Sequence, residues 1–190
     1  MHLSPMRDDK SRGRVVPSDV RSILPIVALT AALAPVALGA GALNVVPADE
    51  LESAVLAELN VVRVEHGLRP LRLNHRLTAA ADAHSREMVL SGYFGHESAD
   101  GSGFASRIKD YYEPRAARRT WTVGENLIWQ ERRLTARAAV TSWLASPGHR
   151  ENLLEPAFRE VGISAVRATA APGVYGKRRV VVLTVDFGAR

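Results

Sequence analysis

Cysteine is absent from this chain of 190 residues. Its absence excludes a disulfide framework, a thiolate zinc site and a cysteine nucleophile. Apolar residues make up 46% of the chain and charged residues 24%, a balance that is typical of a chain that buries a core. A fold without covalent cross-links must be stabilised by that core, and a domain of residues 48–190 is long enough to form one.

The chain also lacks a large surplus of one charge, because its net charge is only +5. A nucleic-acid-binding face normally concentrates its basic side chains, often with aromatic residues between them. The basic residues here form three short clusters that are separated along the chain: Arg115, Arg118 and Arg119; Arg132 and Arg133; and Lys177, Arg178 and Arg179. This pattern favours a solvated basic surface and predicts no nucleic-acid partner.

Charge is missing altogether from Ile23 to Val46, and basic residues precede that stretch. A basic flank, an apolar run and the small residues Ala40-Gly41-Ala42 are the layout of a secretory signal peptide. The run is also long enough to be a retained membrane anchor. Residues 1–46 are therefore predicted to be a basic region with a signal peptide or anchor. Residues 47–190 are then a domain that is secreted, or held outside the cytoplasm at the membrane.

Hydrophobic periodicity predicts several helices in this domain. Apolar residues recur at helical spacing after Asp49, which is predicted to cap a helix that continues to about His66. Asn74 is predicted to cap a second helix, which ends at Gly92. Thr135 is predicted to cap a later one, and the remaining expected helix covers about residues 104–112.

The C-terminal part of the chain has a different pattern. The segments Val161–Val166 and Arg179–Phe187 are rich in β-branched residues, and a turn-forming segment with Pro172-Gly173 separates them. This pattern predicts an antiparallel pair of strands. Because the helices come first and the clearest strands last, the fold class is predicted to be α+β rather than a repeating βαβ array.

Three ionisable side chains, His96, Glu125 and His149, each follow a glycine. A glycine allows the backbone to turn sharply, so each side chain is predicted to point into a cleft. Two imidazoles and a carboxylate can coordinate a divalent metal, or the carboxylate can orient a protonated imidazole for acid–base chemistry. The spacing does not choose between these roles, because the compact zinc signature His-Glu-x-x-His is absent.

Eight short segments carry a family resemblance, and they occur in order along almost the whole predicted domain. They are Leu59–Arg63, Leu71–Asn74, Ala83–Met88, Gly95–Ser98, Gly124–Leu127, Trp143–Leu154, Phe158–Ile163 and Thr184–Gly188. In these segments the chain resembles the CAP superfamily, which comprises cysteine-rich secretory proteins, antigen 5 and pathogenesis-related proteins. Its domains are also called SCP-like. The resemblance is greatest to the bacterial, cysteine-free branch.

The resemblance implies an α–β–α sandwich, in which a small antiparallel sheet lies between helical layers beside a large cleft. In the family, two histidines and two acidic residues line that cleft, and it sometimes holds zinc. His96, Glu125 and His149 match three of those positions. His96 and His149 are therefore the candidate ligands for Zn²⁺, and Asn126 is a further candidate for the cleft lining.

Ser146 stands where the family usually has its second acidic residue, three residues after a tryptophan. This departure weakens the expectation of a metal site and of dedicated catalysis. Glu97, Glu131 and Glu151 are other carboxylates that the fold can bring to the cleft, and the sequence selects none of them.

Three functions remain open, and no catalytic residue is assigned. The resemblance favours a domain that binds a lipid, glycan or peptide ligand, or a component of the cell envelope. A metal-assisted or histidine-dependent hydrolase of the peptidase type is the second interpretation. A structural protein of the cell envelope is the third, although apolar packing would serve that role more simply than a histidine cluster.

Overall fold

The computed structural model describes residues 41–113 and 121–190. These residues belong to one compact unit, Gly39–Arg190. Residues 23–40 of the predicted signal or anchor segment lie outside the described residues, as does the basic cluster of residues 115–119. In the part of the chain that the structure describes, no helix is long and apolar enough to cross a membrane.

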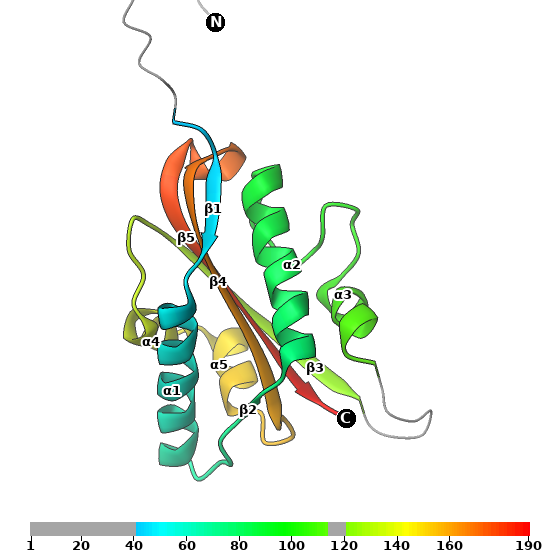
Figure 1. The fold of residues 1–190 in the computed structure, drawn as a ribbon. Helices are drawn as coiled ribbons and strands as arrows, with labels where there is room; N and C mark the ends of the chain where they lie inside the picture. Colours follow the sequence, from blue (N-terminus) through cyan, green and yellow to red (C-terminus); the bar gives the residue numbers. More distant parts are fainter. Residues whose placement is uncertain (1–40, 114–120) are drawn as a thin grey trace, which may run out of the picture. The chain divides into compact units, whose positions relative to one another are not determined.

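A five-stranded sheet forms the centre of the unit (Figure 1). Its strands are β1 (Asn44–Pro47), β2 (Arg72–Leu73), β3 (Thr122–Glu131), β4 (Glu160–Ala171) and β5 (Arg178–Ala189). Strands β1, β4, β5 and β3 lie side by side in that order and pair antiparallel, while β2 pairs parallel with the start of β4. The predicted pairing of the two C-terminal segments is confirmed by β4 and β5.

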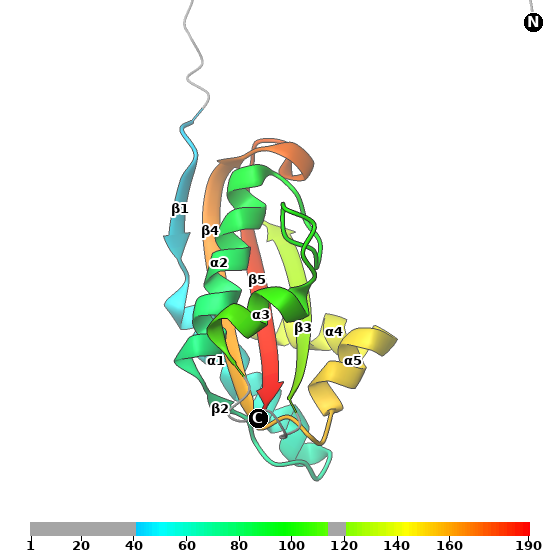
Figure 2. The same cartoon turned by 90° about the vertical axis from the view of Figure 1, so that its right-hand side faces the viewer.

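Helices cover both faces of the sheet (Figures 1 and 2). One face is covered by α2 (His75–Ser91) and α3 (Phe104–Tyr111). The other face is covered by α1 (Asp49–Glu65), α4 (Ala136–Leu144) and α5 (Pro147–Leu154), and a short 3-10 helix, η1 (Gly173–Tyr175), joins β4 to β5. This arrangement confirms the predicted α+β class and the α–β–α sandwich.

The two faces of the sheet bury different side chains, because successive strand residues point to opposite faces. Toward α1, α4 and α5, Leu183 and Phe187 of β5 join a large apolar cluster that includes Trp143. Toward α2, Val182 of β5 packs in a second apolar cluster. The same face also buries Asp186, a carboxyl group. The buried polar side chains of β5, Thr184 and Asp186, therefore lie on the side of α2 and α3.

The helix boundaries follow most of the predicted signals. Asn74 accepts a hydrogen bond from the backbone N–H two residues later, and α2 ends at Gly92 in the left-handed conformation with φ of 74°. Thr135 caps α4 through its side chain. Asp49 does not cap α1 as predicted, since Ala48 occupies the cap position and Asp49 is the first helical residue. An acidic group there still interacts favourably with the helix dipole.

Strands β1, β2 and β3 and helix α5 were not predicted. The segment Gly124-Glu125-Asn126 has low strand propensity, but β3 pairs with β5 along its whole length. Pro147 occupies the first turn of α5, where its fixed φ and missing N–H are tolerated. Strand β1 begins at Asn44, so the sheet includes residues from the segment assigned to the N-terminal region.

Candidate functional site

A cleft of about 350 Å³ opens beside the edge strand β3. Glu125 comes from β3, His96 from the loop after α2, and His149 from α5. The other lining residues are Phe104, Ser146, Gly148 and Asn152. The fold thus brings together three side chains that are far apart in the sequence, and it places Ser146 beside them.

Glu125 is the buried centre of the site, with an exposed fraction of only 3%. Its Oε1 lies 2.8 Å from Nδ1 of His96. Its Oε2 accepts a hydrogen bond from the guanidinium of Arg107, and the two groups form a buried ion pair. Because a buried carboxylate needs a cationic or donor partner, Arg107 is part of the site even though it does not line the cleft.

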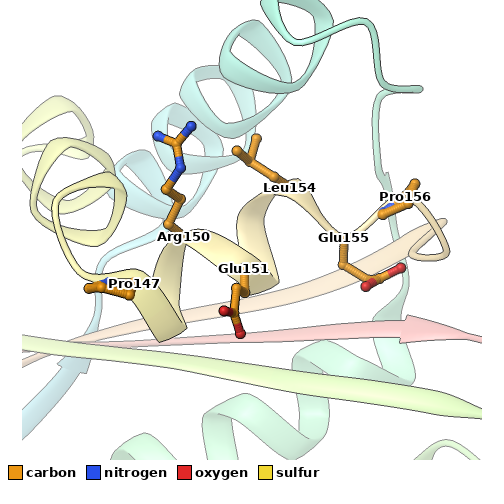
Figure 3. A pocket seen from close by; sticks show the side chains of 6 residues that line it. All are labelled: Pro147, Arg150, Glu151, Leu154, Glu155 and Pro156. Carbon is orange, nitrogen blue, oxygen red and sulfur yellow. The ribbon is translucent and has the colours of Figure 1, made fainter.

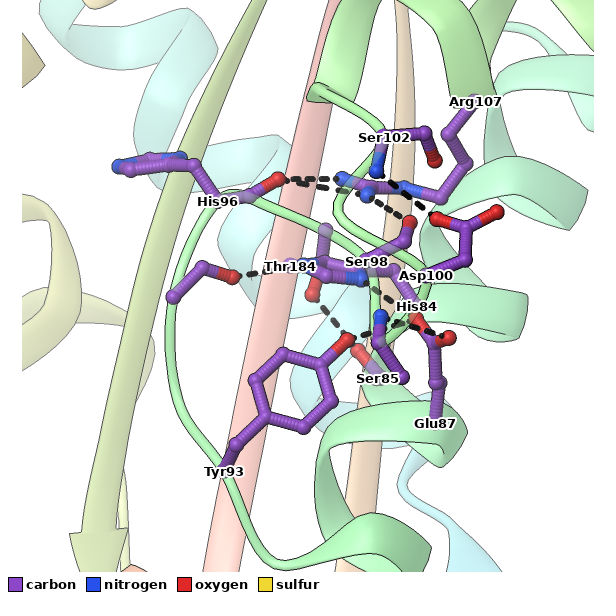
Figure 4. A network of polar contacts seen from close by, with 12 residues as sticks. His84, Ser85, Glu87, Tyr93, His96, Ser98, Asp100, Ser102, Arg107 and Thr184 are labelled. Carbon is purple, nitrogen blue, oxygen red and sulfur yellow. Dashed lines mark hydrogen bonds and ion pairs between the residues drawn. The ribbon is translucent and has the colours of Figure 1, made fainter.

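Arg107 also fixes the loop that carries His96 (Figure 4). Its guanidinium donates to the backbone oxygen of His96 at 3.3 Å and to Oγ of Ser98 at 2.8 Å. On the other side of the same loop, Nε2 of His84 lies 2.9 Å from the backbone oxygen of Gly95. Arg107 was missed because an arginine in a short helix normally points to solvent, and no local signal marks it as buried.

His149 faces His96 across the cleft, with ring centroids 6.4 Å apart. Its Nδ1 lies 2.9 Å from Oγ of Ser146, the residue at the N-cap position of α5. The Ser146 side chain makes no capping hydrogen bond, so its hydroxyl serves the imidazole instead. Partial burial lowers the pKa of His149, and the neighbouring His96 lowers it further.

Two amide side chains join β3 to α5 below the cleft. Asn126 is fully buried and donates to the backbone oxygen of His149 at 3.0 Å. Asn152 donates to the backbone oxygen of Glu125 at 3.0 Å and to Oδ1 of Asn126 at 2.9 Å. Asn152 lines the cleft, whereas Asn126 supports the backbone behind it.

Of the three glycines before the ionisable residues, Gly95 lies at a bend of its loop, and the other two do not make the sharp turns that the sequence suggested. None of Gly95, Gly124 and Gly148 has a positive φ. Gly148 lies inside α5, and Gly124 lies inside β3. A Cβ at Gly124 would lie 2.6 Å from Oδ1 of Asn152. The glycine therefore allows α5 to approach the strand closely, and close packing rather than a turn explains it.

Glu97, Glu131 and Glu151, the carboxylates considered as replacements for the family's second acidic residue, do not line the cleft. Glu151 lies on the outer side of α5, along a separate depression of about 520 Å³ (Figure 3). Glu131 lies at the far end of β3, where it pairs with Arg132 and Arg178. Glu97 is an exposed loop residue.

The carboxyl group that does lie beside the site is Asp186, which was not among the residues predicted from the sequence. Asp186 is fully buried and stands directly opposite Glu125 on the neighbouring strand β5. Burial raises the pKa of Asp186 well above its usual value, and the nearby Glu125 carboxylate raises it further. An aspartate in the middle of a β-branched segment was the available signal, because that pattern predicts a buried position for it.

The donor groups of the cleft do not form a three-ligand zinc site. Both oxygens of Glu125 are already engaged, and one of them is paired with Arg107. Within residues 41–113 and 121–190, no group of three His, Cys, Asp or Glu side chains has a geometry that could hold a metal ion. The remaining donors for Zn²⁺ are the two imidazoles of His96 and His149, so zinc there stays a prediction of a weak site.

Comparisons with known proteins agree with this fold. The family model described as "CAP: Cysteine-rich secretory protein family" matches residues 56–187. Two proteins of Bacillus subtilis (strain 168), the uncharacterized protein YkwD and the uncharacterized membrane protein YlbC, are each 30% identical to the chain. The alignments cover 62% and 61% of this chain, and 43% and 32% of those proteins. The chain thus spans less than half the length of these relatives.

Solved structures share the architecture. An extracellular protein containing an SCP domain from Bacillus anthracis str. Ames matches 75% of this chain and 41% of its own, with a TM-score of 0.57 and 25% identity. An outer surface protein from Borrelia burgdorferi matches 77% of this chain and 98% of its own, with a TM-score of 0.61 and 18% identity. This second likeness shows the fold alone. Together with the family match over residues 56–187, the shared fold shows that this chain belongs to the CAP, or cysteine-rich secretory protein, family.

Proposed function

We propose that this CAP domain works outside the cytoplasm and binds a polar ligand, a glycan or a short peptide, in the cleft between His96 and His149. The observation that carries the proposal is the pair of facing imidazoles, with ring centroids 6.4 Å apart above the buried Glu125. Each Nδ1 has a partner within the protein, Glu125 for one ring and Ser146 for the other. The Nε2 atoms are left for a ligand, because no hydrogen bond to them is formed among the described residues.

The lining favours a polar ligand over a lipid chain. Among the described residues that line the cleft, Phe104 is the one large apolar side chain. The other lining side chains include two imidazoles, a hydroxyl and an amide, whereas the Glu125 carboxylate is already engaged by His96 and Arg107. A cleft of about 350 Å³ is at the small end of ligand sites, which suits one sugar ring or a dipeptide.

The extracytoplasmic location is supported by two separate observations. Residues 23–46 have the layout of an export signal. The matched Bacillus anthracis protein, with 25% identity, is described as extracellular. Protease treatment of intact cells tests the location, and a product that is fully protected and retains Met1 would contradict it.

Calorimetric titration tests the binding proposal with defined probes. The soluble peptidoglycan disaccharide-tetrapeptide serves as the polar probe and palmitate as the apolar one. We expect H96Q and H149Q each to weaken binding of the polar probe about tenfold, which is the worth of one hydrogen bond. The control is H75Q, which changes an exposed histidine at the start of α2. Equal affinity in all variants, or tighter binding of palmitate, would overturn the proposal.

A hydrolase is the second candidate, because Ser146 and His149 are paired at 2.9 Å as a nucleophile and a base would be. The pair lacks an acidic group that orients the imidazole, since Glu125 bonds to His96 instead. A fluorophosphonate probe checks this candidate. Labelling that disappears in S146A and in H149Q would favour the hydrolase over the binding domain.

Zinc binding is tested separately, by titrating Zn²⁺ into the wild type and three variants. We expect H96A and H149A to reduce affinity more than S146A, because the two imidazoles are the free donors. Affinity should also fall below about pH 6, where protonation of the imidazoles competes with the metal. Equal affinity in all four proteins would remove the zinc prediction.

A further inference from the structure

Two of the basic clusters that are separate in the sequence meet at one end of the sheet. Glu131, the last residue of β3, is in register with Val180 of β5. The backbone N–H of Arg132 donates to the backbone oxygen of Arg179 at 2.8 Å. This pairing brings together five exposed cationic side chains: Arg132, Arg133, Lys177, Arg178 and Arg179.

Few acidic groups balance this basic end, which is defined by those five residues. Glu131 lies 3.6 Å from Arg132 and 3.9 Å from Arg178, so it is shared between two cations. Glu50 lines a nearby groove together with Arg133. Arg133, Lys177 and Arg179 form no ion pair within the described residues. Three cationic side chains thus remain available for an anionic partner.

Exposed apolar side chains lie at the same end of the molecule. Val174 of η1 is 56% exposed, and Leu90 near the end of α2 is 57% exposed. The backbone N–H of Val174 donates to the backbone oxygen of Gly92, so the two elements are in contact. Leu43, which is 38% exposed, precedes β1 at this end, as Figures 1 and 2 both show for the start of that strand.

The uncharged stretch of the sequence leads into this same end. Residues 23–46 carry no charge, and their last part forms β1, whose Asn44 is in register with Thr169 of β4. The hydroxyl of Thr169 donates to the backbone oxygen of Ala42. The chain therefore enters the sheet beside the β4–β5 connection. A protein that leaves a membrane through residues 23–42 presents this end to the bilayer first.

We propose that the basic end and its apolar side chains dock on an anionic lipid bilayer. Cationic side chains beside an anionic membrane are attracted within about a Debye length of its surface, and apolar side chains between them can enter the headgroup region. The cleft is not part of this surface. Glu125 lies six residues before Glu131 on β3, about 20 Å along the strand, so it stays clear of the docked end. The inference does not depend on the proposed ligand of the cleft.

The absence of cysteine makes a clean test possible, because a single introduced cysteine can carry an environment-sensitive fluorophore. The full chain is reconstituted into vesicles of phosphatidylcholine, with or without phosphatidylglycerol. One variant carries the label at V174C, and the control carries it at V64C, a residue that is 59% exposed on α1. We expect a blue shift for the label at position 174 only, on the anionic vesicles only, and its loss in 0.5 M salt.

A charge variant separates docking of the basic end from membrane insertion of the uncharged stretch, residues 23–46. The triple change R133Q, K177Q and R179Q leaves the pairs of Glu131 intact and should reduce the docking equilibrium constant about 100-fold, or about fivefold for each charge. A matched triple change, R69Q, R72Q and R76Q, removes three exposed charges at the opposite end and should have no effect. Circular dichroism checks that both triple variants fold.

Three results would overturn the inference. The first is an equal shift on both kinds of vesicle, which would mean that charge does not matter. The second is the same shift for the label at position 64, which would mean that the domain binds in no fixed orientation. The third is equal docking by the two triple variants.

Discussion

The two faces of the central sheet differ in what they bury. Odd-numbered residues of β5, such as Leu183 and Val185, point toward α1, α4 and α5 and belong to the large apolar cluster. Even-numbered residues include Thr184 and Asp186, which are buried on the side of α2 and α3. The β5 side chains of the first face contribute apolar packing, whereas those of the second lie beside hydrogen bonds and a buried ion pair. The stability contributed by the first face should therefore be insensitive to pH, and that of the second should depend on it.

The largest loss of stability is expected from breaking the buried ion pair between Arg107 and Glu125 on the polar face. R107M leaves the Glu125 carboxylate buried without its cation, which should cost about 3–5 kcal/mol in the free energy of unfolding. Urea denaturation at pH 7 measures it. The double variant R107M/E125Q removes both charges and should recover much of the loss. A double variant that is as unstable as the single one would show that charge is not the cause.

A comparable loss of stability is expected from a substitution on the apolar face, but this loss should not depend on pH. L183A removes a fully buried side chain from the large apolar cluster and should cost about 2–5 kcal/mol. The same denaturation experiment is repeated at pH 5, 7 and 8. A loss that varies with pH would contradict the proposed difference between the faces.

The third prediction uses the pH dependence of Asp186. Since burial raises its pKa in the folded state, the folded protein holds the proton more tightly than the unfolded chain does. Unfolding then releases a proton, and the wild type loses stability as pH rises above about 3.9, the ordinary pKa of aspartate. D186N cannot titrate, so its stability relative to the wild type should increase as the pH rises above about 4, until the pH reaches the raised pKa of Asp186.

The control for Asp186 is D110N, which changes an exposed aspartate of α3. Its stability relative to the wild type should stay constant over the same range. A flat difference for D186N as well would show that Asp186 carries no buried proton.

A smaller effect is expected at Thr184, whose Oγ1 accepts a hydrogen bond from Oγ of Ser85 at 2.8 Å. T184V keeps the shape and leaves the Ser85 hydroxyl without this acceptor, so it should cost about 1 kcal/mol. S85A/T184V removes both groups and should be more stable than T184V. If T184V is instead as stable as the wild type, the polar face owes its stability to packing as well.

The smallest effect is expected at His149. Burial and His96 lower its pKa in the folded state, so the unfolded chain binds its proton more readily. The wild type should therefore lose stability as pH falls below about 6.5, the ordinary pKa of histidine. H149Q should remove part of this loss, and H75Q, at an exposed position, should not. Thermal unfolding between pH 5 and pH 7 compares the three proteins.

The sequence predicted the elements whose signals are local. The caps at Asn74 and Thr135, the end of α2 at Gly92 and the pair of C-terminal strands are all as expected. Strand β3 was missed because Gly124-Glu125-Asn126 has low strand propensity. Its conformation depends on pairing with β5, a partner more than fifty residues away.

The residues of the candidate site also fall into two groups: those that the sequence indicated and those that only the structure revealed. His96, Glu125 and His149 were chosen from the sequence by their motifs, and the structure places them in one cleft. Arg107 and Asp186 were not chosen, although both are buried beside Glu125. An arginine in a helix and an aspartate in a strand acquire these roles only from their neighbours in space.

The sequence by itself determined the fold class, indicated the CAP family and nominated His96, Glu125 and His149 as candidates for one cleft. These depend on periodicity, caps and ordered motifs, which extend over only a few neighbouring residues. The tertiary structure alone decided that Asp186, not Glu97, Glu131 or Glu151, lies beside Glu125. It also decided that two separate basic clusters meet at one end of the sheet. Both outcomes follow from the register between β3 and β5, which is set by packing over the whole core.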